Sequence, residues 1–199
     1  MTTKPASGKT SISYEEINQL PLRAFEGKVV VISDAKKLHA AFEEINTHHQ
    51  VGFDTETKPV FVKGHRNKVS ILQVALPDKA FIIRLLATEL THEIVHFLQN
   101  NRIHKAGVAI RDDIKALQHL KKFEPAGFIE LAQLAKESGL EVESVKKLTA
   151  LLLGFRISKS AQTSNWEAEQ LNEKQISYAA TDAWVCLEIY KQLKRFKTN

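Results

Sequence analysis

Apolar residues follow two patterns along this chain, and each pattern predicts a different kind of element. Stretches in which apolar residues alternate with polar ones, or run unbroken between turn residues, are typical of strands. Such stretches predict strands over residues 28–33, 51–57, 69–76, 80–85, 104–109 and 127–129. The turn sequence Pro77-Asp78-Lys79 separates the third of these from the fourth, so we expect these two strands to form a hairpin.

Elsewhere apolar residues recur three and four positions apart, which is the spacing of an amphipathic helix. This pattern predicts helices over residues 34–45, 91–100, 112–122, 131–138, 144–153 and 173–195, with a short helix over 13–21. The order is a strand, a helix, three adjacent strands, and then alternating helices and strands. It predicts an α/β fold with a mixed central sheet of about five or six strands flanked by helices.

Length and composition fit a single globular domain. The chain has 199 residues, of which 43% are hydrophobic and 26% charged, enough to bury a sizeable core. Residues 1–12 are polar and predict a flexible N-terminal tail, which leaves 13–199 as the folded domain.

Charge and cysteine content indicate which compartment and which kind of binding partner to expect. The single cysteine, Cys186, allows no intramolecular disulfide, and we find no signal-peptide or membrane-spanning pattern. We therefore expect a cytoplasmic protein with no membrane partner. The net charge of +5 suits an anionic partner such as nucleic acid, although a solvated charged face explains it equally well.

Two carboxylates stand together at the end of the second predicted strand. In the sequence VGFDTET, Asp54 and Glu56 are two residues apart, so on a strand they project from the same face. Hard divalent cations such as Mg²⁺ prefer carboxylate oxygens. An Asp-x-Glu pair also arises often by chance, so this pair predicts a metal site only if other acids converge on it.

Two later segments contain acids that can converge on this pair. Tyr178 and Asp182 are four residues apart on the last predicted helix and share a face, although a surface pair without a role is the alternative. Asp112 and Asp113 follow the predicted strand–helix junction at 107–110. One of these two acids can cap the helix, and Asp112 is well placed to do so.

Three segments of the chain resemble the three exonuclease motifs of the DEDD superfamily, tyrosine subclass. They are FDTET with the following KPVF and VSILQVA, then GVAIRDDIKAL, then SNW and EKQISYAATDA. The resemblance covers roughly residues 28–195 and is closest to Werner-syndrome-type exonuclease domains and ribonuclease D. It implies a ribonuclease H-like fold, with which the predicted order of elements is compatible.

The resemblance also implies an activity, metal-dependent hydrolysis from the 3′ end of DNA or RNA that releases nucleoside 5′-monophosphates. Its catalytic positions fall on Asp54, Glu56, Asp113 (in preference to Asp112), Tyr178 and Asp182. Two carboxylates ~4 Å apart repel by ~4 kcal/mol at an effective dielectric of 20, so four of them need bound cations. We expect two Mg²⁺ or Mn²⁺ ions, with Asp54 bridging both and Tyr178 orienting the attacking water.

Basic and aromatic residues near these motifs are candidate nucleic-acid contacts. They are Lys58, Lys63, Arg66 and Lys68 after the second strand, and Lys159, Ser160 and Trp166 before the last helix. Lysine and arginine attract phosphates. Trp166 can stack on a base or pin its segment to the core. A nucleic-acid-binding module that has lost catalysis is the alternative function.

A second motif indicates different chemistry. Residues 92–96 read His-Glu-Ile-Val-His, the H-E-x-x-H pattern of zinc peptidases, on a predicted helix. Ile94 and Val95 fall on the apolar face, which leaves His92, Glu93 and His96 on the polar one. A catalytic zinc needs a third protein ligand, and no H-x-x-G-x-x-H extension follows. We therefore expect an exposed polar helix face rather than a zinc peptidase.

Overall fold

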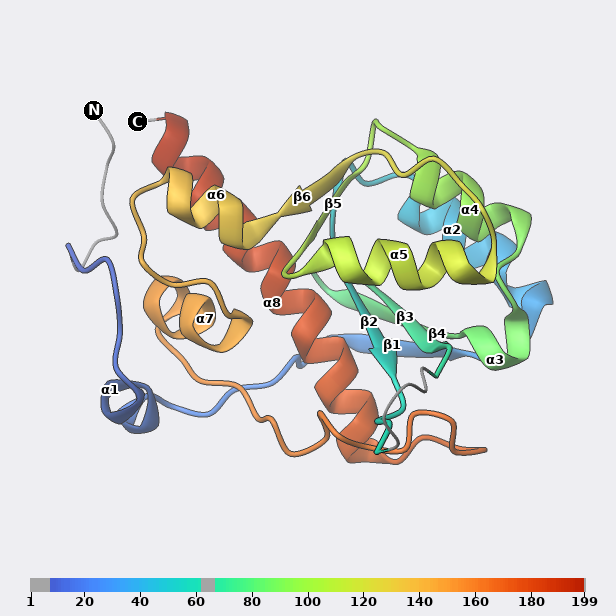
Figure 1. The fold of residues 1–199 in the computed structure, drawn as a ribbon, viewed down its shortest axis with the longest axis horizontal. Helices are drawn as coiled ribbons and strands as arrows, with labels where there is room; N and C mark the ends of the chain where they lie inside the picture. The colour runs from blue at the N-terminus through green and yellow to red at the C-terminus, as the bar shows by residue number, and fades with distance from the viewer. Residues whose placement is uncertain (1–7, 62–66, 199) are drawn as a thin grey trace.

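The computed structural model describes residues 8–61 and 67–198, and a single mixed sheet organises them (Figure 1). Its strands are β1 (Lys28–Ile32), β2 (Gln50–Thr57), β3 (Val69–Ala75), β4 (Lys79–Arg84), β5 (His104–Gly107) and β6 (Phe128–Glu130). Their order across the sheet is β1-β4-β3-β2-β5-β6. The pairs β2–β3 and β3–β4 are antiparallel and the other three are parallel, which confirms the predicted mixed sheet.

Helices form before, between and after the strands. They are α1 (Tyr14–Gln19), α2 (Leu38–Ile45), α3 (Leu85–Thr88), α4 (His92–Gln99), α5 (Ile110–Leu120), α6 (Leu131–Glu137), α7 (Val145–Leu153) and α8 (Glu173–Thr198). A 3-10 turn, Ala35–Lys37, replaces the start of the helix predicted over 34–45. The four-residue helix α3 was not predicted, because it is too short to show a helical period.

The two faces of the sheet carry separate apolar layers. Val51 and Phe53 of β2 point toward α2, α4 and α5, where a large core cluster forms. The alternate residues of β2 point toward α8, and in Figure 1 this helix runs diagonally on the side of the sheet away from α2 and α4. Because side chains alternate along a strand, Asp54 and Glu56 face α8 whereas Thr55 faces the α5 side.

Helix α8 lies against β2 because Gly52 has no side chain. A Cβ at Gly52 would lie 1.8 Å from the carbonyl oxygen of Ala183, so any other residue would push the helix away. This close approach brings the middle of α8 to the strand two residues before Asp54. The fold therefore places Asp182 beside the carboxylate pair of β2.

The N-terminal end of the chain is partly held to the rest. Residues 1–7 of the predicted tail lie outside the described residues. The carbonyl oxygen of Thr10 accepts a hydrogen bond of 2.8 Å from the backbone N–H of Glu141. Ser13 and Glu16 form the predicted capping box at the start of α1. None of the described helices is long and apolar enough to span a lipid bilayer.

Candidate active site

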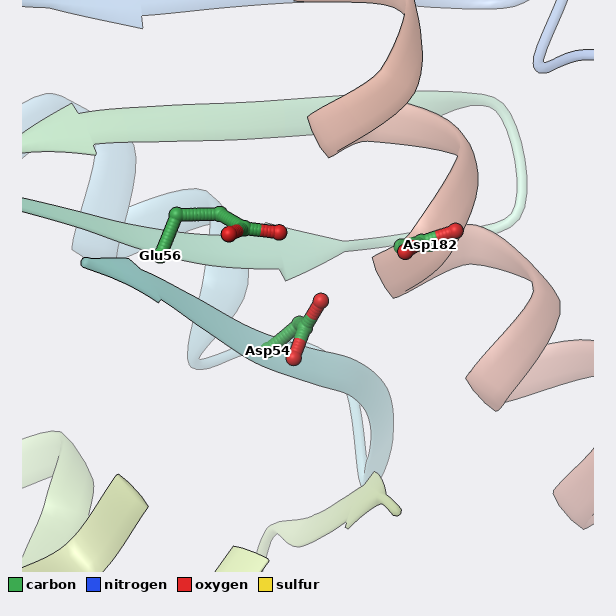
Figure 2. A group of neighbouring side chains, drawn as sticks. All are labelled: Asp54, Glu56 and Asp182. Atoms are coloured by element: carbon green, nitrogen blue, oxygen red, sulfur yellow. The ribbon is translucent and has the colours of Figure 1, made fainter. Parts of the chain in front are cut away.

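Three carboxylates converge where β2 passes under α8. Asp54, Glu56 and Asp182 each place one oxygen within 4.8 Å of the others. Figure 2 shows the first two on the strand and the third on the helix, with the carboxyl groups turned toward one another. Within the described ranges this is the sole group of three potential metal ligands at such a distance. The structure thus brings Asp182 together with two residues of β2 that lie more than a hundred positions earlier in the chain.

The start of α8 fixes where Asp182 lies. Asn172 and Gln175 form the predicted capping box through two reciprocal hydrogen bonds of 3.0 Å. Asp182 is 4% exposed and Tyr178, one turn earlier on the same face, is 6% exposed. Because both side chains are almost fully buried, their orientation is set by packing rather than by solvent.

The carboxyl groups of this cluster hold their protons unusually tightly. Burial, followed by repulsion from Asp182, raises the pKa of Asp54 well above its usual range. The same two causes raise the pKa of Glu56 to about 8. Burial also raises the pKa of Asp182, although the nearby Lys159 ammonium partly opposes this. Ionising these carboxyl groups is therefore costly without a counter-ion, and a bound cation would offset that cost by taking the place of the protons.

Asp113 approaches the strand from the other side. It lies in the first turn of α5, and the hydroxyl of Thr55 donates a 2.5 Å hydrogen bond to its Oδ1. Burial raises the pKa of Asp113 to about 6, against the Thr55 hydrogen bond, which lowers it. Asp113 is not among the three converging ligands, whereas its neighbour Asp112 is exposed to solvent. Of these two acids, Asp113 is thus the one that is hydrogen-bonded to β2.

The helix that carries Asp113 begins in an unusual way. Asp112, the predicted cap, lies inside the first turn and does not cap it; the N-cap residue is Ala109, in the left-handed region with φ 59°. Glu130 instead accepts the backbone N–H groups of Ala109 at 3.1 Å and Ile110 at 3.0 Å. The same carboxylate also caps α6 through Ala132. Sequence reasoning missed Thr55 and Glu130 because both act across elements.

Lys159 and Tyr178 complete the surroundings of Asp182. The Lys159 ammonium lies 3.5 Å from Oδ2 of Asp182 and 5.7 Å from the centre of the Tyr178 ring. Oδ1 of Asp182 is buried, and none of the residues that the structure describes forms a hydrogen bond with it. Burial, followed by repulsion from Asp182, raises the pKa of Tyr178 above its usual range, so its hydroxyl stays protonated.

These donors fit a hard divalent cation. All three converging ligands are carboxylates, which Mg²⁺ and Mn²⁺ prefer. The orphaned Oδ1 of Asp182 gives a buried acceptor that a cation would satisfy. The pKa values of Asp54 and Glu56, raised first by burial and then by repulsion from Asp182, indicate that a cation would also offset the cost of ionising them.

The candidate nucleic-acid contacts differ in their exposure and in the partners of their side chains. Lys58 forms a 3.0 Å ion pair with Glu167, and Lys68 is exposed; Lys63 and Arg66 lie outside the described residues. Ser160 is exposed, and its hydroxyl is 2.9 Å from that of Ser158. Trp166 is 0% exposed, which favours its packing role and leaves no ring face for a base in this structure.

The two histidines of the H-E-x-x-H helix lie on its solvent-facing side. His92 and His96 are exposed on α4, with ring centres 6.5 Å apart. In the parts of the chain that the structure describes, no third ligand joins them. A hydrogen bond from its own backbone N–H, at the start of α4, lowers the pKa of Glu93, whereas the pKa of Glu56 is raised. The predicted exposed polar face is confirmed.

Comparisons with known proteins agree with this architecture. A family model for 3′–5′ exonucleases matches residues 29–196. The mouse bifunctional 3′–5′ exonuclease/ATP-dependent helicase WRN is 31% identical over 88% of this chain, which corresponds to 13% of that protein. The crystal structure of the Aedes aegypti Nibbler EXO domain is 26% identical with a TM-score of 0.76, covering 89% of this chain and 92% of that one.

A more distant structure shares the fold. Escherichia coli ribonuclease D is 21% identical with a TM-score of 0.77, over 86% of this chain and 45% of that one. These neighbours confirm the expected ribonuclease H-like fold. The chain spans less than a third of the length of the first curated relatives it matches. The match of one family model to most of the sequence shows that this chain belongs to the 3′–5′ exonuclease family.

Proposed function

We propose that this chain is a metal-dependent 3′–5′ exonuclease that hydrolyses phosphodiester bonds of DNA or RNA by a two-metal-ion mechanism. The observation that carries the proposal is the convergence of Asp54, Glu56 and Asp182 within 4.8 Å. Membership of the exonuclease family and the net charge of +5 support a nucleic-acid substrate. The products would be nucleoside 5′-monophosphates.

The carboxylates would hold two Mg²⁺ or Mn²⁺ ions. Asp54, Glu56 and Asp182 would bind one ion, and Asp54 together with Asp113 would bind the second. When bound, such ions lower the pKa of an attacking water and stabilise the leaving 3′-oxygen. Asp113 keeps Oδ2 for this purpose, because Thr55 occupies Oδ1. The hydrogen bond also fixes the direction in which that oxygen points.

Tyr178 would orient the water rather than deprotonate it. The raised pKa keeps its hydroxyl protonated at neutral pH, so the hydroxyl can donate or accept a hydrogen bond but is a poor base. Its position one turn before Asp182 places it beside the ligand cluster. Lys159, 3.5 Å from Asp182, is placed to meet the phosphate of a substrate at the same edge.

A cleavage assay tests this function. A 5′-labelled oligonucleotide, as DNA and as RNA of the same sequence, is incubated with the chain and either MgCl₂ or MnCl₂, with and without EDTA. We expect stepwise shortening from the 3′ end that EDTA abolishes. Intact substrate in every condition, together with retained binding, would reject the enzyme in favour of a nucleic-acid-binding module of the same fold.

Two neighbouring acids give a matched control for this assay. Asp113→Asn should abolish shortening, because the second cation loses a ligand. Asp112→Asn changes the same type of side chain one residue away, but Asp112 is exposed, so activity should be kept. Equal losses in the two variants would contradict the assignment of Asp113.

A further inference from the structure

Gln73 is a buried amide on the strand next to Asp54. It lies in β3, is 0% exposed, and pairs with Asp54 in the antiparallel ladder between β2 and β3. Directly opposed residues of an antiparallel pair project from the same face with Cβ atoms about 4.5–5.5 Å apart. The Gln73 side chain is therefore on the α8 side of the sheet, next to the carboxylate of Asp54.

The amide of Gln73 makes no hydrogen bond in this structure. Among the described residues, six buried side-chain polar atoms lack a partner, and four of them belong to Gln73, Trp166 and Asp182. A buried polar group without a partner costs about 1–3 kcal/mol, so folded proteins rarely keep one without a reason. Asp182 belongs to the carboxylate cluster, and Gln73 is the strand partner of Asp54.

Trp166 belongs to the same layer as Gln73. Its ring packs in the apolar cluster that contains Ile71 and Ile82. Ile71 is two residues before Gln73 on the same face of β3. Ile82 is the residue of β4 that pairs with Gln73. The Nε1–H of Trp166 has no acceptor, and the ring centre lies 5.9 Å from that of Tyr178.

The three groups have complementary hydrogen-bonding capacities. An indole N–H only donates, an ionised carboxylate only accepts, and a glutamine amide does both. One arrangement satisfies every group: Trp166 donates to the carbonyl oxygen of Gln73, and the NH₂ of Gln73 donates to Asp54. Direct donation from Trp166 to a carboxylate would also pair the indole, but it would leave the carbonyl oxygen of Gln73 without a donor.

We infer that Gln73 is a positioning residue: in the cation-bound chain its amide would donate to the Asp54 carboxylate and accept a hydrogen bond from Trp166. The inference rests on the proposed function in that Asp54 is a metal ligand. Groups that hydrogen-bond to a ligating carboxylate fix its orientation, and removing such a group commonly weakens metal binding about 10- to 100-fold. In this arrangement Gln73 would connect Trp166, in the segment before α8, to Asp54 of β2.

Calorimetric titration with MnCl₂ tests the inference without using nuclease activity. Gln73→Met keeps the length of the side chain and removes both polar atoms, and it should raise the Kd for Mn²⁺ at least about tenfold. Trp166→Phe keeps an aromatic ring but removes the N–H, and it should raise the same Kd by a smaller factor. Ile82→Met changes a buried neighbour with no polar atoms and should leave the Kd unchanged.

Thermal unfolding in EDTA separates positioning from a structural role. Because the Gln73 amide is unpaired, Gln73→Met should melt at the wild-type temperature or above it. A large drop in melting temperature, or loss of the cooperative transition, would show that the amide holds the fold and would overturn the inference. A wild-type Kd in either Gln73→Met or Trp166→Phe would also overturn it.

Failure of the proposed function gives a different result. If the wild-type chain binds Mn²⁺ but cleaves no oligonucleotide, the exonuclease proposal falls and the comparison of Kd values still decides the role of Gln73. If the wild-type chain binds no Mn²⁺, Asp54 is not a metal ligand, and the inference about Gln73 is overturned as well.

Discussion

The carboxylate cluster and the H-E-x-x-H helix make an instructive pair, because both bring potential metal ligands together. The ligands of the cluster come from separate elements, β2 and α8, and burial raises the pKa of each. The ligands of the helix come from one turn of α4; His92 and His96 are exposed and Glu93 is half-buried, with its pKa lowered. What separates the two regions is burial and convergence from distant segments rather than local spacing.

The physical consequence is a difference in electrostatic strain. In the cluster, burial and mutual repulsion make it costly to ionise the carboxyl groups. A bound cation would offset that cost. On α4, water solvates each side chain separately, so a metal would have little strain to relieve. The comparison predicts that substitutions in the first region have large and metal-dependent effects, whereas those in the second have almost none.

The largest expected effect comes from Asp54→Asn. This change keeps the shape of the side chain and removes the charge that both cations would share. We expect the rate of 3′-end shortening to fall by at least about 100-fold, the scale for removing one group aimed at a reacting centre. The measurement is the initial rate on a labelled oligonucleotide at saturating MnCl₂.

The matched change in the other region is Glu93→Gln. It also neutralises one carboxylate, but at a half-buried position on α4 outside the carboxylate cluster, so the rate should stay at the wild-type level. A substantial loss in Glu93→Gln, or a retained rate in Asp54→Asn that folds normally, would break the distinction between the two regions.

The Thr55 hydroxyl should produce the next largest effect. Thr55→Val has nearly the same shape but cannot donate to Asp113, and it should lower the cleavage rate and raise the MnCl₂ concentration needed for half-maximal rate, each by about 10- to 100-fold. Thr55→Ser keeps the hydroxyl and should restore most of the loss. If Thr55→Val and Thr55→Ser lose the same activity, the contribution of Thr55 is packing and not the hydrogen bond.

Part of this site could be predicted from sequence because local periodicity determines it. A period of two puts Asp54 and Glu56 on one face of a strand, and a spacing of four puts Tyr178 and Asp182 on one face of a helix. The order of strands and helices likewise follows from apolar patterning. These features depend on neighbours within a few residues, which a single sequence displays directly.

The remaining features depend on how distant segments pair. The hydrogen bond from Thr55 to Asp113 joins residues 58 positions apart, and the one from the backbone N–H of Ala109 to Glu130 spans 21. The pairing of Gln73 with Asp54 follows from the register of β2 and β3, which the hairpin pattern of β3 and β4 does not determine. The sequence left open whether Trp166 packs on the core or stacks on a base, because its segment has no regular period that would assign it a buried face.

The third prediction concerns pH and stability without metal. Glu56 has a folded-state pKa of about 8, above its ordinary value of 4.5, so the folded chain binds more protons than the unfolded chain between these values. Stability that this group contributes is therefore complete below pH 4.5 and is lost as the pH rises through about 8. Ionised Glu56 thus destabilises the metal-free protein at alkaline pH.

Melting curves of Glu56→Gln in EDTA measure this effect. The variant should melt higher than the wild type at pH 9 by a few degrees, since 1 kcal/mol shifts a domain of this size by roughly 2–4 °C. Near pH 4 the difference should be absent, and saturating MnCl₂ should reverse its sign at pH 9 because the wild type then gains the cation. Parallel pH profiles for the two proteins in EDTA would contradict the raised pKa.

The smallest expected effect concerns the second region and completes the comparison. The double change of His92 and His96 to Ala removes both imidazoles of the H-E-x-x-H helix, but their rings are exposed and the nearby Ile94 keeps the buried contact of α4. We expect the free energy of unfolding to change by less than about 0.5 kcal/mol, as is usual for surface sites. Casein with ZnCl₂ should stay intact, because two imidazoles and a solvated carboxylate leave a catalytic zinc without a closed site. Zinc-dependent proteolysis that the double variant loses would show that an exposed motif can act without burial, and the distinction drawn from the cluster would then fail.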